Sequence, residues 1–366
     1  MKWKEQLKGM AAYQPGKSEE EVKRTFGLTK IVKLASNENP YGSSTAVEEY
    51  LNRVDLKANI YPDGYAGKLR EALSKKLNVR PGQLLFGDGA DEIISIISRS
   101  LLRPGVNAIM SKPSFVQYRH NAKVEGAEFR EIPVKEGAQD LEKMLLAIDG
   151  QTTVVWLCSP NNPTGTLLKT EDLIKFMERV PTDVLVVLDE AYVHYITEPD
   201  FNEPISLLDR FENLLLLRTF SKIYGLASFR VGYAIGQESV ISMLDPVRSP
   251  FNVSSISLGV AEAALADDEF IEMCRTKNAA GREQFRSYCE KRNLHLFDSQ
   301  ANFMLMEVKA DADTVFLQLM KRGFIVRSGT GLDAPNYIRV TVGTKEQNDE
   351  FFEKLDEVLK ELGVLS

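Results

Sequence analysis

Six apolar runs of strand length constrain this chain more than any other feature of its sequence. The clearest are "VLVVL" at 184–188 and "NLLLL" at 213–217. Their hydrophobic residues are continuous and do not alternate with polar ones, which is typical of strands buried on both faces of a sheet. Helix-like segments separate several of the runs, as in sheets whose parallel strands are joined by helical crossovers. The sequence therefore predicts an α/β fold with a mostly parallel central sheet between helices.

The predicted elements follow one another in a regular order. Predicted strands lie at 83–87, 107–112, 152–160, 183–192, 213–220 and 230–236, and predicted helices at 90–102, 114–126 and 169–180. After about residue 255 the pattern changes to helices, including one long helix within 258–293 that we expect to join two domains. Strand-like and helix-like segments then alternate in a smaller α+β unit.

The length of 366 residues favours two domains, because single cores stop growing near about 250–300 residues. The first 30 residues have little core-forming pattern and are interpreted as an arm that packs on the body or on a partner subunit. We therefore expect an arm at 1–30, a large domain at 31–265 and a small domain at 266–366.

Composition excludes several classes of function. The net charge of −7 and the pI of about 5.3 argue against a nucleic-acid-binding surface. No apolar run approaches the roughly 20 residues that cross a bilayer. Three cysteines without a CxxC pair and without an apolar leader indicate reduced thiols in the cytoplasm, and three scattered histidines indicate no His-rich metal site. These features predict a cytoplasmic enzyme without a metal or a membrane partner.

Polar residues follow two of the predicted strands directly. Asp189 comes after "VLVVL", and Asn162 lies in "SPNNPTG" after the strand at 152–160. The alternative interpretation is that both residues form turns or helix caps. The carboxyl ends of parallel strands, however, meet at one edge of the sheet, where α/β proteins bind ligands. A buried carboxylate at that edge needs a cationic partner, and Tyr192 lies three residues further on.

The stretch "RTFSKIYGLASFRVG" at 218–232 places a lysine, Lys222, where another core strand ends. A lone lysine there often reaches solvent. Here Thr219, Ser221 and Arg230 accompany it. A helix that opens in "FGDGADEI" at 86–93 adds backbone N–H groups suited to phosphate, although the third glycine of a dinucleotide motif is missing. Pyridoxal 5′-phosphate would use the phosphate donors, the carboxylate and the lysine together.

These motifs together resemble the fold-type I pyridoxal-phosphate-dependent aminotransferases of class I/II. Further motifs resemble the histidinol-phosphate aminotransferase family, and the similarity runs in order along nearly the whole chain. They are "KLASNENPYG" (33–42), "NIYPDGYAGKLREAL" (59–73), "GDGADE" and "IRVTVGT" (338–344). The resemblance implies a homodimer that transfers an amino group between L-histidinol phosphate and 2-oxoglutarate, giving imidazole acetol phosphate and glutamate in histidine biosynthesis.

The resemblance also implies a role for individual residues. Lys222 corresponds to the lysine that bonds the cofactor and moves the substrate proton, and Asp189 to the partner of the ring nitrogen. Asn162 and Tyr192 correspond to the ligands of the ring oxygen, and Phe115 to a ring stacked on the cofactor. The implied phosphate ligands are Thr219, Ser221, Arg230, the backbone of Ala90 and Asp91, and Tyr61 from the other subunit.

The resemblance implies a substrate end built around Arg339, which binds the substrate anion. Arg327 corresponds to a second anion-binding arginine, although an exposed edge charge is the alternative. Tyr13 and Asn39 are further candidates for this end. We expect Tyr118 to join Tyr13 and Phe115 in an apolar lining there.

Two other activities stay open from the sequence. Threonine-phosphate decarboxylase has a similar sequence plan and a phosphorylated amino substrate. A broader transaminase would also accept tyrosine or phenylalanine. A pyridoxal-phosphate-binding regulator, in contrast, would need a DNA-binding domain, for which the first 30 residues are too short.

Overall fold

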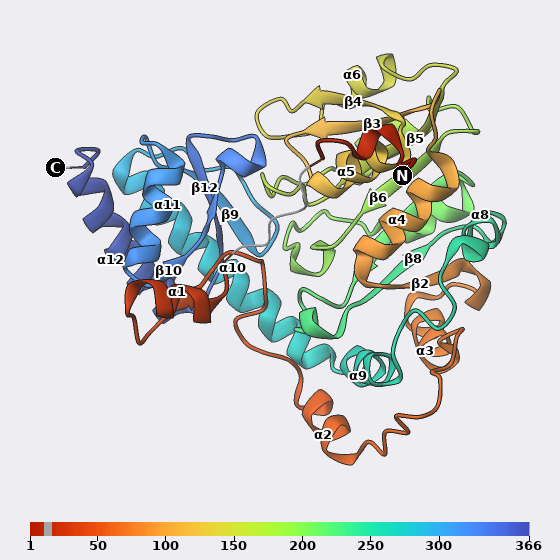
Figure 1. The fold of residues 1–366 in the computed structure, drawn as a ribbon, viewed down its shortest axis with the longest axis horizontal. Helices are drawn as coiled ribbons and strands as arrows, with labels where there is room; N and C mark the ends of the chain where they lie inside the picture. The colour runs from red at the N-terminus through yellow and green to blue at the C-terminus, as the bar shows by residue number, and fades with distance from the viewer. Residues whose placement is uncertain (11–16, 366) are drawn as a thin grey trace.

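A seven-stranded sheet forms the centre of the computed structural model, which describes residues 1–10 and 17–365 (Figure 1). In spatial order its strands are β2 (Leu84–Asp88), β8 (Val231–Ile235), β7 (Leu214–Thr219), β6 (Leu185–Asp189), β5 (Thr152–Cys158), β3 (Asn107–Lys112) and β4 (Glu128–Pro133). Every neighbouring pair is parallel except those that include β8, which is antiparallel to β7 and β2. The predicted α/β fold with a mostly parallel sheet is confirmed.

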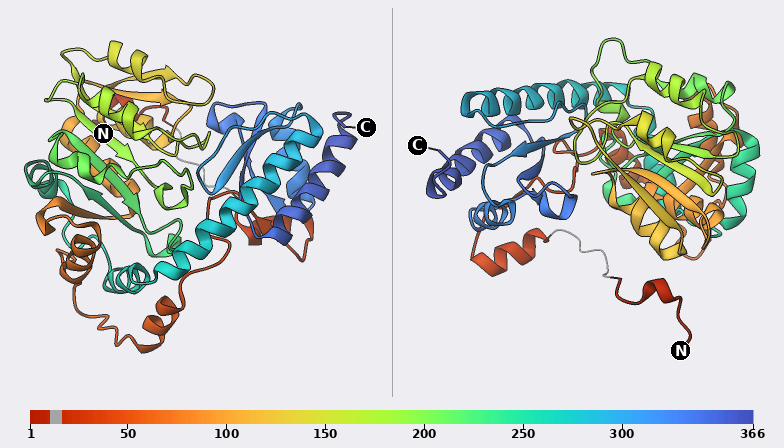
Figure 2. Two further views of the ribbon diagram at one scale, coloured as in Figure 1. Left: turned by 180° about the vertical axis from the view of Figure 1, so that it is seen from behind. Right: turned by 90° about the horizontal axis from the view of Figure 1, so that it is seen from above.

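The sheet is buried on both faces, as the continuous apolar runs indicate. Along β7, Leu214 and Leu216 point into one core while Leu215 and Leu217 point into the other. Helices cover both faces (Figures 1 and 2). They are α3 (Gly67–Leu77), α4 (Gly89–Leu101), α5 (Val116–Glu125), α6 (Leu141–Leu146), α7 (Thr170–Met177), α8 (Glu238–Leu244) and α9 (Ser255–Leu265), and α2 (Thr45–Arg53) packs against α9.

Strand β4 was not predicted from the sequence. Its sequence "EFREIP" carries three charged residues and no apolar run, and most of its side chains are half-buried. It lies at the edge of the sheet, where charged side chains discourage pairing with another chain. A search for buried strands therefore passes over it.

The C-terminal part forms a second, smaller α+β unit. Its antiparallel sheet has the order β11 (Arg327–Ser328), β12 (Tyr337–Thr341) and β9 (Phe303–Glu307), packed by α11 (Ala312–Lys321) and α12 (Lys345–Glu361). The expected long helix is α10 (Asp268–Arg292), which runs from α9 to this sheet (Figures 1 and 2). Asp267 begins it by accepting a hydrogen bond from the backbone N–H of Phe270 at 2.9 Å.

The beginning of the chain contacts both parts of the molecule. Gln6 donates a hydrogen bond to the carbonyl of Val124 in α5. Helix α1 (Glu19–Phe26) packs Val22 into a small core of the C-terminal unit. The short strand β1 (Val32–Lys33) then pairs in parallel with β10 (Phe324–Ile325). Among the described residues, no helix combines the length and the apolar character needed to cross a membrane.

Candidate active site

A cavity of about 240 Å³ lies at the carboxyl ends of the central strands and is closed on one side by the C-terminal unit. Most of the predicted site residues line it. They are Ala90, Asp91, Phe115, Asn162, Asp189, Tyr192, Thr219, Ser221, Lys222, Arg230, Arg327 and Arg339. The structure thus brings residues that are up to 250 positions apart in sequence together around one cavity of ligand size.

Asp189 ends β6 and is 3% exposed. Its Oδ1 accepts a hydrogen bond from the N–H of Ala191 at 3.0 Å, and its Oδ2 accepts one from the hydroxyl of Tyr118 at 2.6 Å. Burial raises the pKa of this carboxyl to about 6. A carboxylate held in such a place is stabilised by a nearby cation, and a protonated ring nitrogen meets that requirement.

Tyr118 does not lie at the substrate end of the cavity, so this expectation was wrong. The side chain is fully buried behind Asp189, stacked on Trp156 with ring centres 4.8 Å apart. The edge of Phe115 packs against it at 5.6 Å. Spacing along α5 places Phe115 and Tyr118 on one face of a helix but does not tell which ring faces the cavity.

Lys222 follows β7 and points toward the same space. Its Nζ donates to the carbonyl of Ser36 at 3.2 Å and lies 5.6 Å from the ring centre of Tyr192. Burial, together with the positive charge of Arg339, lowers the pKa of the amine to about 8. A larger neutral fraction makes this lysine a better nucleophile and base than an ordinary one.

Arg230 and the start of α4 form a concave group of donors. Nη1 of Arg230 donates to Ser221 Oγ at 3.3 Å, and Nη2 lies 3.8 Å from a carboxylate oxygen of Asp91. The first N–H groups of α4 have no partner within their helix. Gly89 is the first residue of α4 and has φ +74, and a Cβ atom there would lie 2.3 Å from Nη2 of Arg230. The positive φ favours glycine at this position, and the cradle suits a phosphate.

Asn162 and Tyr192 meet above the strand ends. The side-chain amide of Asn162 donates to the Tyr192 hydroxyl at 3.4 Å, and that of Asn37 donates to it at 3.0 Å. Burial raises the pKa of Tyr192. No role for Asn37 was predicted from the sequence. Its only local signal is the motif "KLASNENPYG", where it adopts φ 56, a conformation uncommon for residues other than glycine.

Arg327 and Arg339 lie directly opposite each other on β11 and β12. Arg339 is 8% exposed, and its guanidinium donates to Asn162 Oδ1 at 2.6 Å and to the carbonyl of Ala35 at 2.8 Å. Within the described part of the chain, no carboxylate forms an ion pair with Arg327. Like charges opposite each other on two strands are unfavourable, so the pair favours an anionic ligand.

Two of the predicted residues that the structure describes, Tyr61 and Asn39, do not line the cavity. Tyr61 is 79% exposed and stacks on Phe251 at the surface. The amide of Asn39 donates to the carbonyl of Ile223 at 2.7 Å and also contacts Cys274 Sγ at 3.3 Å. Tyr13 lies outside the described residues. The roles expected of these residues stay predictions.

The polar groups around the cavity fit pyridoxal 5′-phosphate. The cradle at Gly89 suits the phosphate, Asp189 a basic ring nitrogen, and Lys222 an aldehyde. These groups sit at the strand ends of an α/β sheet, beside a smaller domain. Fold and site together define a pyridoxal-phosphate-dependent enzyme of fold type I.

Comparison with known proteins gives the family. The model of the family described as aminotransferase class I and II matches residues 29–355. A histidinol-phosphate aminotransferase of Lysinibacillus sphaericus is 56% identical over the full length of both chains, and one from Geobacillus is 52% identical over 99% of both. The structure of histidinol-phosphate aminotransferase from Sinorhizobium meliloti in complex with pyridoxal-5′-phosphate superposes with a TM-score of 0.90 at 25% identity, covering 98% of each chain. The chain belongs to the class I and II aminotransferases, among the histidinol-phosphate aminotransferases.

Proposed function

We propose that the protein transfers an amino group between L-histidinol phosphate and 2-oxoglutarate, giving imidazole acetol phosphate and glutamate, as a step in histidine biosynthesis. The observation that carries this proposal is the pair of arginines facing each other across β11 and β12 beside the cavity. One substrate brings a phosphate and the other a second carboxylate. A pair of planar guanidinium groups binds either anion through parallel hydrogen bonds.

Bound pyridoxal phosphate supplies an electron sink for the charge left when the substrate loses its Cα proton. Lys222 takes that proton and returns it, since its pKa of about 8 leaves part of the amine neutral near neutral pH. Asp189 would hold the ring nitrogen as its charged partner and keep it protonated. Asn162 and Tyr192 would hold the ring through its oxygen.

Arg339 connects the anion clamp to these ring contacts. Its Nη1 is fixed by Asn162, which in turn contacts the Tyr192 hydroxyl. Its second nitrogen is fixed by the carbonyl of Ala35. The guanidinium is therefore held in one orientation when it binds the substrate anion. A fixed anion places the substrate Cα close to the proton-transfer base, as the reaction requires.

We further propose that the enzyme is a cytoplasmic homodimer in which Tyr61 completes the partner's phosphate site. The supporting observation is a group of large side chains that this chain alone leaves at its surface. Ile60, Tyr61 and Tyr65 are 63%, 79% and 67% exposed, and Phe251 stacks on Tyr61. Exposed apolar groups of this kind mark association surfaces.

The assay that tests the activity uses the purified enzyme loaded with cofactor, L-histidinol phosphate and 2-oxoglutarate. Glutamate formation without CO₂ is the expected result. Release of CO₂ from threonine phosphate would instead indicate the decarboxylase. A substrate panel with tyrosine and phenylalanine, followed through the spectra of each half-reaction, measures whether the specificity is broader.

A further inference from the structure

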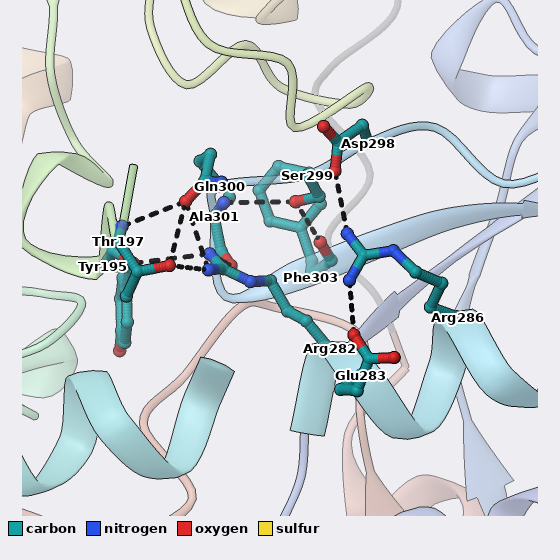
Figure 3. Close-up of polar contacts among 10 residues, drawn as sticks. All are labelled: Tyr195, Thr197, Arg282, Glu283, Arg286, Asp298, Ser299, Gln300, Ala301 and Phe303. Carbon is teal, nitrogen blue, oxygen red and sulfur yellow. Dashed lines mark hydrogen bonds and ion pairs between the residues drawn. The ribbon is translucent and has the colours of Figure 1, made fainter. Parts of the chain in front are cut away.

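A buried arginine at the middle of α10 joins the two parts of the molecule. Arg282 is 4% exposed. On one side its guanidinium donates to the carbonyl of Tyr195 at 3.3 Å and to Thr197 Oγ1 at 2.6 Å. On the other it donates to Gln300 Oε1 at 3.1 Å and to the carbonyl of Ala301 at 3.5 Å (Figure 3). Tyr195 and Thr197 come after strand β6 of the central sheet, whereas Gln300 and Ala301 come just before strand β9 of the smaller unit.

The acceptors around Arg282 are neutral oxygens. Among the residues that the structure describes, no carboxylate lies within ion-pair distance of its guanidinium. Burial lowers the pKa of Arg282 to about 10, so the group still carries its charge at neutral pH. Burying a charge without an opposite charge is unfavourable. A planar group with five N–H donors is well suited to hold two chain segments at once from one helix position.

Further hydrogen bonds hold the junction at 299–303 against the large domain. The N–H of Gln300 donates to the carbonyl of Gly165 at 2.8 Å, and its Oε1 accepts from the N–H of Thr197 at 3.0 Å. Asn278, one turn before Arg282 on α10, donates to the carbonyl of Ala301 at 3.1 Å. Gly165 has φ +80, and a Cβ atom there would lie 2.1 Å from Ser299 Oγ. The two parts of the chain are therefore in close contact at this point.

The junction leads directly into the wall of the active site. The amide of Asn302 donates to the carbonyl of Asn37 at 3.0 Å. The ring of Phe303 packs edge-on against Tyr192 at 5.0 Å and lies 5.3 Å from the guanidinium of Arg339. A shift of the junction therefore moves Arg339 relative to the side of the cavity that would hold the cofactor.

We propose that Arg282 is a positioning residue that fixes the junction at 299–303 to the large domain and so sets the place of Arg339 relative to Lys222. The inference rests on the proposed transamination, because it assigns to Arg282 the alignment of the substrate anion with the proton-transfer base. Arg282 itself touches neither substrate nor cofactor. Its loss misaligns the substrate without removing any group that binds the cofactor.

The test compares Arg282→Met and Arg282→Lys with Arg286→Ala in the cofactor-loaded enzyme. Arg286 lies one turn further on α10 and binds Glu283 and Asp298 at the surface, so it is the matched control (Figure 3). We expect kcat/KM for histidinol phosphate to fall about ten- to hundredfold in Arg282→Met, because a displacement of about 1 Å can have that effect. The visible absorbance of the bound cofactor should stay unchanged. Arg282→Lys should recover part of the loss, and Arg286→Ala should match the wild type.

The inference is overturned if Arg282→Met folds and keeps the wild-type kcat/KM. It is also overturned if cofactor absorbance and kcat/KM fall together in proportion to a lower melting temperature, which would indicate a role in stability alone. Should Arg282→Met not fold, Thr197→Val removes one acceptor and is expected to lower kcat/KM in the same direction. If the wild type does not act on histidinol phosphate, the proposed function fails, and calorimetric affinity of the loaded variants for 2-oxoglutarate decides the role of Arg282.

Discussion

The two walls of the active-site cavity are built in different ways. The cofactor wall consists of strand ends of the central sheet, such as Asp189 and Thr219, which are anchored in two apolar cores. The substrate wall consists of Arg327 and Arg339 on a three-stranded sheet whose outer strand has only two residues. The cofactor wall is therefore rigid before any ligand binds, whereas the substrate wall depends on how the smaller unit is held. Substitutions on the cofactor wall should affect chemistry and cofactor binding. Substitutions on the substrate wall should affect substrate binding.

The largest effect is expected for Lys222→Ala. The change removes the amine that bonds the cofactor and moves the Cα proton, and we expect activity to fall by at least about 10⁴-fold. The amine donates a hydrogen bond to the carbonyl of Ser36 at 3.2 Å, and the loss of one such bond should leave the fold intact. Absorbance spectra should lack the band of the lysine-bound cofactor. Wild-type turnover in this variant would exclude the mechanism.

Arg339→Ala should act on substrate binding and leave cofactor absorbance intact. Truncating one partner of a buried charge pair weakens binding by about 2–5 kcal/mol, which should appear as a higher KM for both substrates. Arg327→Ala is the matched control from the opposite strand position. Arg327 is only half-buried, so its effect should be smaller and more sensitive to salt. A change in kcat alone for Arg339→Ala would show that the clamp is wrongly assigned.

Asp189→Asn should separate cofactor binding from protein stability. Burial raises the pKa of Asp189 from 3.8 to about 6, so the folded protein without cofactor binds a proton more tightly than the unfolded chain. Stability therefore decreases as pH rises from about 4 to about 6, by up to about 3 kcal/mol, and stays lower above that range.

Asparagine cannot ionise, so the cofactor-free variant should be more stable than the wild type at pH 8 and similar to it near pH 4. With pyridoxal phosphate bound, the wild type should be more stable than the variant, because the ring nitrogen has no counter-charge in the variant. Denaturant unfolding at both pH values, with and without cofactor, measures this. Equal stability of the two cofactor-free proteins at pH 8 would contradict the assignment of burial as the cause.

Local sequence predicted the cofactor wall better than the rest of the molecule. Asp189 and Lys222 each follow an apolar run, and strand ends converge by geometry alone. Strand β4 has no apolar run because it lies at an edge. The contacts of Asn37 with Tyr192 and of Arg282 with Tyr195 join segments more than 80 positions apart, and neither residue stands in a pattern that points to these partners. Tyr118 was assigned to the wrong end because helical spacing does not specify which ring faces the cavity.

The smallest effect is expected for Tyr118→Phe, which tests the corrected place of this residue. The change removes the hydroxyl that donates to Asp189 at 2.6 Å and keeps the ring stacked on Trp156. This hydrogen bond lowers the pKa of Asp189, so its loss should raise that pKa. The acid limb of the kcat/KM–pH profile should move upward by about one unit, since a hydrogen bond to a charged group contributes about 1.5 kcal/mol. Tyr288→Phe is the control, because Tyr288 donates to Asp356 at 2.7 Å away from the cavity. An identical shift in both variants, or none in either, would mean that Tyr118 does not act through Asp189.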